Sequence, residues 1–191
     1  TTANFSVTTT AVVSDVSATI MATAAAISKT VTVSVVRTTP ASVTIAPTSL
    51  IGGNNAVGTV TTNGPAPTGG LVVTLASGNP SVTVPATVTV SAGQTAATFA
   101  VSTTAVVADT TVSISATANG TTQSGGVTVL RSNLKSVSIN RSWTVGGTSK
   151  ILRVVLDGKA PVGGLLINLA SDNAVATVPA TVTVPAGADQ T

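Results

Sequence analysis

The sequence predicts an all-β protein built from β-sandwiches in tandem, and three observations lead to this prediction. The chain repeats itself at a shift of 94 residues without a gap, and 43 of the 97 positions that overlap at this shift are identical. Its apolar residues alternate with polar ones in short segments, which is the period of a half-buried strand. Only 2% of its residues are aromatic, and its abundant Thr and Val are β-branched residues that favour strands.

The repeat extends along the whole chain. Residues 65–77 return as residues 159–171, and residues 5–15 return as residues 99–109. A fixed period of this length is typical of domains that follow one another in an array. The size of one period, 94 residues, is normal for a small sandwich.

The phase of the repeat divides the chain into a half, a whole and a half. Residues 1–37 match the C-terminal half of a unit, residues 38–131 form a complete unit, and residues 132–191 match the N-terminal half. An isolated half-sandwich leaves its apolar face and its strand edges open. Two explanations stay open: the chain is a window on a longer tandem array, or its C-terminal half is completed by the N-terminal half of the next subunit. The second joint is head-to-tail and gives an open filament.

In the first half-unit, alternation predicts strands over residues 3–10, 17–24 and 29–36. Asp15 lies between the first two, and its side chain is expected to accept a backbone N–H and close the turn.

The complete unit contains seven or eight short predicted strands separated by turn residues. Pro47 interrupts the first of them, as proline does on an edge strand, and Gly125-Gly126 in the last predicts a bulge. Short strands with a turn every ~8–12 residues are typical of an immunoglobulin-like sandwich. The predicted strands cover residues 42–46, 56–62, 71–76, 81–84, 87–91, 95–103, 110–118 and 122–130.

Short connections separate the units, at residues 37–40 and 131–134. Connections of a few residues leave little freedom between neighbours, and Pro40 fixes its own φ. We therefore expect a stiff rod.

The composition excludes several classes of function. Charged residues make up only 7% of the chain, against about 25% in ordinary domains. Such a surface packs laterally at little desolvation cost, which suits bundling in a fibre or sheath. The net charge is +3, but the basic residues are scattered and there are one Trp, two Phe and no Tyr. This pattern argues against nucleic-acid binding. There is no Cys for disulfides, and no apolar run is long enough for a membrane span.

The residue types of common catalytic sites are missing. The chain has no His and no Glu, which excludes Ser-His-Asp triads and nearly all zinc sites. Its five carboxylates are separated in sequence: Asp15, Asp109, Asp157, Asp172 and Asp189. We predict no enzyme activity and no catalytic, cofactor-binding or metal-binding residue. A weak calcium site at a domain junction, through Asp15 or Asp109, stays an alternative to their role in turns.

Two further features leave alternatives open. Trp143 is either a plug in a core or domain junction, or an exposed anchor for a neighbouring subunit or a sugar. The triplets that begin at Asn4, Asn119 and Asn140 match the N-glycosylation sequon, so an attached glycan is an open alternative.

The chain resembles the tandem bacterial immunoglobulin-like (Ig-like) repeats of large secreted or surface-anchored proteins. The resemblance lies in residues 66–70, 84–90, 92–94 and Phe99, and it extends over both copies of the repeat. It implies an Ig-like sandwich and an extracellular or cell-surface location. Such repeats serve as stalks, adhesin arms and sheath components, so a shared fold does not identify a site.

The predicted function is a structural subunit or segment of an extracellular fibre, stalk or sheath, whose partners are copies of itself. The alternative is an adhesin arm or a carbohydrate-binding surface module. An exposed Trp143 beside polar groups favours the alternative, whereas a buried Trp143 favours a structural role.

Overall fold

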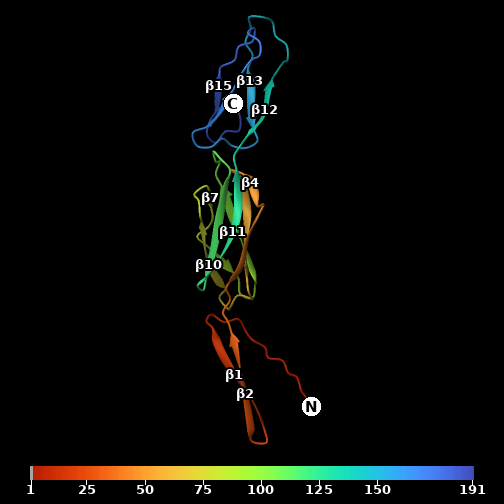
Figure 1. Cartoon of the computed structure of the whole chain (residues 1–191), viewed down its shortest axis with the longest axis vertical. Coiled ribbons are helices and arrows are strands. Elements are labelled where there is room, and N and C mark those ends of the chain that lie inside the picture. Colours follow the sequence, from red (N-terminus) through yellow and green to blue (C-terminus); the bar gives the residue numbers. More distant parts are fainter. Residues whose placement is uncertain (1) are drawn as a thin grey trace.

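The computed structural model describes residues 2–191, and every regular element in them is a β-strand. The molecule is a rod of three bodies along its long axis, with a hairpin at one end, a sandwich in the middle and the C-terminal strands at the other end (Figure 1). The prediction of an all-β, Ig-like architecture is confirmed. The described residues hold no helix that is long and apolar enough to cross a membrane.

The central body, from Pro40 to Leu130, is a β-sandwich of two sheets. One sheet has the order β4-β11-β10-β6-β8 and the other has the order β3-β5-β9-β7. Neighbouring strands are antiparallel except for β11 and β4, which are parallel. The strands are β3 (Pro40–Ala46), β4 (Ser49–Ile51), β5 (Asn55–Thr62), β6 (Leu71–Ser77), β7 (Val82–Thr83), β8 (Thr87–Val90), β9 (Ala96–Thr103), β10 (Thr110–Ala118) and β11 (Thr121–Leu130).

Alternate residues of these strands point inward and form one apolar core. Val60 and Phe99 come from one sheet, and Val73, Ile114 and Val129 come from the other; all five are buried. The core is therefore made of aliphatic side chains with a single aromatic ring, as the low aromatic content requires.

Two glycines make room for close packing inside this sandwich. Gly58 on β5 lies directly opposite Phe99 on β9, and a Cβ at Gly58 would overlap the ring of Phe99. Gly125 on β11 faces the other sheet, where a Cβ would lie 2.5 Å from the backbone oxygen of Val43 and 2.8 Å from Cδ1 of Ile45. The predicted bulge at Gly125-Gly126 is wrong, because β10 and β11 pair without a register shift. Gly125 is needed for close packing instead.

Strand β4 and the change of sheet before it are not predicted by the sequence pattern. Strand β3 belongs to the four-stranded sheet, whereas β4 pairs with β11 in the five-stranded sheet. Pro47 lies between them, so the interruption predicted there is the point at which the chain changes sheets. A strand of three residues is too short to show an alternation.

The N-terminal body is a single hairpin of β1 (Val16–Ala24) and β2 (Ile27–Val35). The strand predicted over residues 3–10 is absent. Its equivalent in the central sandwich is β9, which pairs with β5 and β7. No equivalent of either partner lies beside residues 3–10, so the segment has nothing to pair with.

The C-terminal body has two strand pairs, β12 (Leu134–Ile139) with β13 (Leu152–Leu156) and β14 (Leu165–Asn168) with β15 (Thr181–Val184). These are the equivalents of β3, β5, β6 and β8 at the 94-residue shift. A small core lies between the two pairs: Val154, Leu156, Ala160, Ile167 and Val184.

Candidate functional site: repeated junctions and uncovered sheet faces

The carboxylates do not gather into a metal-binding group in the part of the chain that the structure describes. Among residues 2–191, no group of three or more His, Cys, Asp or Glu side chains lies close enough together to hold a metal ion. The contacts that recur in the molecule lie where one body meets the next, and exposed apolar residues lie on the two flanking bodies.

Asp15 and Asp109 occupy the same place in successive units and make the same contact. Oδ1 of Asp15 accepts the backbone N–H of Arg37 at 2.8 Å, and Oδ1 of Asp109 accepts that of Arg131 at 2.9 Å. A backbone N–H is the donor that the sequence predicts, but the predicted donor lay in the adjacent turn. The donor instead follows the last strand of the unit, so the carboxylate fixes the point where the chain leaves that unit.

The residues that follow each of these arginines are fixed by the next unit. Thr38 Oγ1 donates to the carbonyl oxygen of Pro65 at 2.7 Å, and Ser132 Oγ donates to that of Lys159 at 2.7 Å. Each pair is the other shifted by 94 residues. The hydroxyl is buried in both cases, so the two junctions use one design.

A third contact recurs one residue later. The backbone N–H of Thr39 donates to Oδ1 of Asn63 at 2.9 Å, and that of Asn133 donates to Oδ1 of Asp157 at 2.7 Å. In the first junction, Asn119 Nδ2 also donates to the carbonyl oxygen of Thr38 at 2.8 Å. Successive residues of each connection are therefore held by one unit or the other, which supports the expected stiff rod.

The second junction is also closely packed. A Cβ at Gly158 would lie 2.8 Å from Oγ of Ser132 and would overlap the side chain of Ile51. A Cβ added to Gly53, in the central body, would lie 3.6 Å from Cδ of Lys159. The central and C-terminal bodies therefore touch through glycines, and a larger residue at Gly158 would push them apart.

Trp143 lies on the surface and is 66% exposed. The guanidinium carbon of Arg141 is 5.7 Å from the centroid of its ring, within the range of a cation–π contact. Of the two alternatives for Trp143, the structure shows the exposed position and not the plug in a core or domain junction. The equivalent residue, Ser49 on β4, is exposed even though the central sandwich is complete, so this position faces outward in a finished unit.

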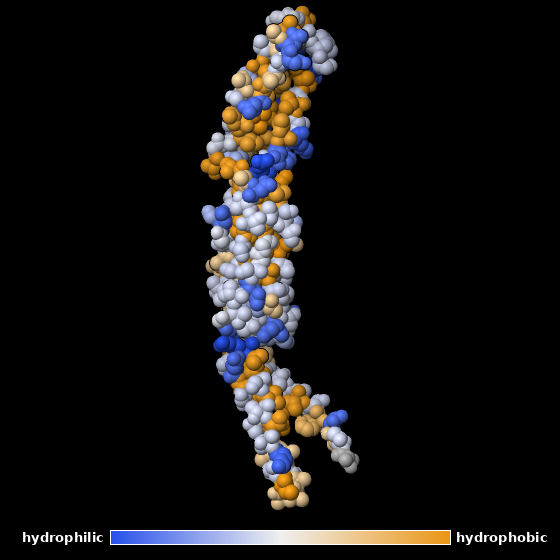
Figure 2. Space-filling view, in the orientation of Figure 1, coloured by the Kyte–Doolittle hydropathy of each residue, from blue (hydrophilic) through white to orange (hydrophobic). Residues whose placement is uncertain are grey.

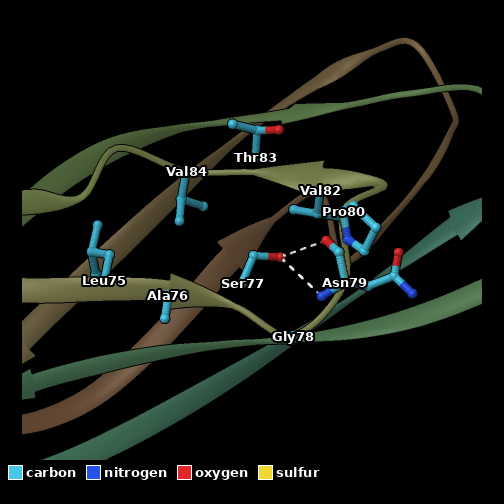
Figure 3. Close-up of a pocket in the computed structure, with 9 residues that line it drawn as sticks. All are labelled: Leu75, Ala76, Ser77, Gly78, Asn79, Pro80, Val82, Thr83 and Val84. Carbon is cyan, nitrogen blue, oxygen red and sulfur yellow. Dashed lines mark hydrogen bonds between the residues drawn. The ribbon is translucent and has the colours of Figure 1, made fainter.

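The pocket drawn in Figure 3 is a repeated turn rather than a ligand site. Ser77 Oγ donates to the carbonyl oxygen of Asn79 at 3.0 Å, and Oδ1 of Asn79 accepts the N–H of Ser81 at 2.9 Å. The same contacts recur at Ser171 and Asn173, where an equivalent pocket is found. The lining of the first pocket, residues 75–80 and 82–84, contains no charged side chain.

The flanking bodies expose large apolar side chains that the central body buries. Exposed large apolar residues number eight in residues 2–37, three in residues 38–131 and ten in residues 132–191. Figure 2 shows apolar surface over the C-terminal body and along the N-terminal hairpin, and a mostly intermediate surface over the sandwich. These uncovered faces are the candidate interaction surfaces.

The central sandwich identifies what would cover each face. There, β10 pairs with β6, β9 pairs with β5, and β11 pairs with β4. Shifted by 94 residues, the C-terminal body offers the equivalents of β5 and β6 and lacks those of β10 and β11. It has only the beginning of the β9 equivalent, because Gln190 pairs with Val155 on β13 as Ala96 pairs with Thr61 in the central body. Residues 2–37 contain the segments equivalent to β9, β10 and β11 and lack the others. The two bodies lie at opposite ends of the rod (Figure 1), so they cannot cover each other within one molecule.

Comparisons with known proteins add little about function. No family model matches the sequence, and no curated protein matches it. Among solved structures, the D0-D1 domain of intimin aligns over 80% of this chain and 82% of its own, with a TM-score of 0.41 and 12% sequence identity. At this TM-score, nothing about function is transferred from that protein to this chain.

Proposed function

We propose that the chain is a structural subunit or segment of an extracellular fibre, stalk or sheath, in which Ig-like units follow one another head to tail. The observation that supports this most strongly is the repeated junction. Three hydrogen bonds, accepted by Asp15, Pro65 and Asn63 at the first junction, have equivalents at the second. A connection made twice in the same way can be repeated with further units at the same relative orientation, so the product is a regular rod.

The uncovered faces allow further units to be added to such a rod. The C-terminal body ends in an open sheet, and a neighbouring unit that supplies the missing strands completes it. The joint is heterologous, because the two surfaces that meet are different, and a heterologous joint that does not close gives a filament. The role is mechanical and requires no catalytic group.

Low surface charge supports lateral packing of these rods. Charged residues are 7% of the sequence, and the outward side chains of the central strands are mostly Thr and Ser. Hydroxyls are less costly to desolvate than charges when two rods come into contact. Bundling of fibres into a sheath is therefore compatible with this surface.

Location and mass of the native material test the proposal. Antibodies against the chain should label appendages or a surface layer in immunogold electron microscopy, and label confined to the cell interior would refute an extracellular fibre. The denatured mass should separate the two forms of the fibre. A band near 18.4 kDa indicates assembled short subunits, whereas hundreds of kDa indicate a covalent array.

The exposed Trp143 favours a second candidate, an adhesin arm or carbohydrate-binding module. An exposed aromatic ring beside a cationic side chain offers both a stacking face and hydrogen-bond donors. Binding of glycans should quench the emission of Trp143, the chain's single Trp. A glycan screen in which Trp143→Ala binds as well as the parental chain would refute this candidate.

A further inference from the structure

The missing half of the C-terminal body can be specified residue by residue from the central sandwich, if the proposed head-to-tail function holds. In the central body, Gly58 lies opposite Phe99 and Ala56 lies opposite Val101. The equivalents of Gly58 and Ala56 on the C-terminal side are Leu152, in β13, and Lys150. The strand that completes this body must fit these two side chains.

The side chain of Leu152 limits the size of the residue that the completing strand can place opposite it. At the equivalent position, even a single Cβ on Gly58 would overlap the ring of Phe99, which is itself buried at 5% exposure. Leu152 adds four carbons there, and in the uncovered body it is 40% exposed. A Phe at this position of the completing strand would have to leave the place that the Phe99 ring occupies, whereas a small residue fits opposite Leu152.

Residues 2–37 of a second copy carry the wrong residue at this position. Phe5 is the equivalent of Phe99, so completion by a copy of this chain would place Phe5 on Leu152. Overpacked buried positions force side chains off their rotamers and shift the backbone. The adjacent pair is also mismatched, because Val7 would face Lys150 and offer no acceptor for its ammonium group.

A second mismatch lies on the opposite sheet. Val31 on β2 stands where the central unit has Gly125, whose added Cβ would lie 2.5 Å from a backbone oxygen of β3. The equivalent strand in the C-terminal body, β12, keeps Val137 and Ile139 at the positions of Val43 and Ile45. Because the nearest atom belongs to the backbone, no change of side chain relieves this contact.

We infer that the half which completes the C-terminal body is an Ig-like half-unit different from residues 1–37 of this chain. It carries Gly or Ala opposite Leu152 and an oxygen acceptor, from a carboxylate or an amide, opposite Lys150. In the completed C-terminal body, Leu152 on β13 fills the space that the ring of Phe99 fills in the central unit. Identical chains consequently do not join end to end, and neighbouring units in the fibre differ in sequence.

An engineered disulfide reports the joint directly, because the full chain has no Cys. Asn4→Cys and Arg153→Cys occupy the places of Thr98 and Thr59, which lie directly opposite each other. The central hydrogen bonds from Thr62 to Thr95 and from Thr103 to Asn54 make Thr59 and Thr98 a non-hydrogen-bonded pair, and such pairs have the short Cα separation that a disulfide requires. Oxidation of joined chains would give a ladder on a non-reducing gel.

Three versions of the full chain with both cysteines are compared. The first has no further change. The second carries Leu152→Gly, Lys150→Ala and Val31→Gly, which restore the residues of the central unit. The third is a control that carries Ile151→Gly and Thr32→Gly, which place glycine on the outer faces beside the same positions.

The second version is expected to form the ladder in a yield at least about tenfold above that of the other two, because it alone removes the overpacked contacts. Phe5→Ala alone should raise the yield of the first version and lower that of the second, a reversal of sign that reports direct coupling between positions 5 and 152. An equal ladder in the first version would overturn the inference and support completion by identical copies. Absence of a ladder in all three would refute completion in this register and, with it, the proposed joint.

Discussion

Hairpins β10–β11 and β1–β2 occupy the same place in successive units, yet they differ in what covers them. Ile114 on β10 and Val129 on β11 are 0% exposed. Their equivalents Ile20 and Val35 are only partly buried. Both hairpins have the same register and nine paired positions. The hairpin forms from its local pattern in both cases, whereas burial depends on the opposite sheet, which only the central body has.

The difference predicts where substitutions act on stability, and the largest effect is expected in the central core. Ile114→Ala should lower the free energy of unfolding of the sandwich by about 2–5 kcal/mol, because it opens a cavity in a closed core. Ile20→Ala should cost less than about 1 kcal/mol, because water already reaches that side chain. Urea titration followed by circular dichroism measures both. Equal losses would show that the N-terminal hairpin is covered in solution.

A smaller effect is expected from copying the C-terminal pattern into the central unit. Gly58→Leu should destabilise the sandwich by about 1–3 kcal/mol through overpacking against Phe99. Adding Phe99→Ala should restore part of this loss, because the bulk moves from one strand to the other. Thermal unfolding of the single and double variants measures the coupling. A double variant that is less stable than Gly58→Leu would contradict the volume exchange proposed for Leu152.

Loss of a junction contact should cost about 1 kcal/mol. Asn119→Ala removes the hydrogen bond to the carbonyl oxygen of Thr38, which is worth about 0.5–1.5 kcal/mol. The equivalent turn of the N-terminal hairpin has Ala25 in place of Asn119, also with positive φ, and it lacks this amide. The effect is read from the amide exchange of Thr38 and Thr39. Ala25→Asn serves as the matched control and should leave their exchange unchanged.

The smallest effect concerns Trp143, whose environment should not depend on folding. Its emission maximum should be red-shifted, and acrylamide should quench it almost as well in the native chain as in urea, because the ring is 66% exposed. Arg141→Ala should change the emission slightly by removing the nearby cation. Strong protection from acrylamide would show that Trp143 is covered by a neighbouring molecule.

The sequence was sufficient for the fold class and for most strands of the central unit, since alternation and a fixed period report buried faces directly. It was not sufficient for residues 3–10, because alternation indicates a strand only if a partner strand is present. The bulge that it predicted at Gly125 was also wrong. A glycine within a strand fits either a bulge or a close approach, and only the position of Val43 on the other sheet distinguishes them.

The carboxylates and Trp143 show the same limit of prediction from sequence. Repetition of Asp15 and Asp109 correctly suggested that each accepts a backbone N–H, but the donor lies 22 residues away in sequence. Such a contact is set by how strands meet at the end of a sheet and not by local turn chemistry. The sequence left both a buried and an exposed Trp143 open, and only its equivalence to the exposed Ser49 distinguishes them.

The central claim is that one closed sandwich is flanked by two open half-units, and native-state hydrogen exchange of the full chain tests it most directly. Amides at equivalent positions form internal controls, such as Val127 on β11 and Val33 on β2. We predict that amides in β10 and β11 exchange only through global unfolding of the sandwich, whereas those in β1 and β2 exchange far faster through local opening. Equal protection of the two hairpins would contradict the claim, because it would mean that identical chains already cover each other's open faces.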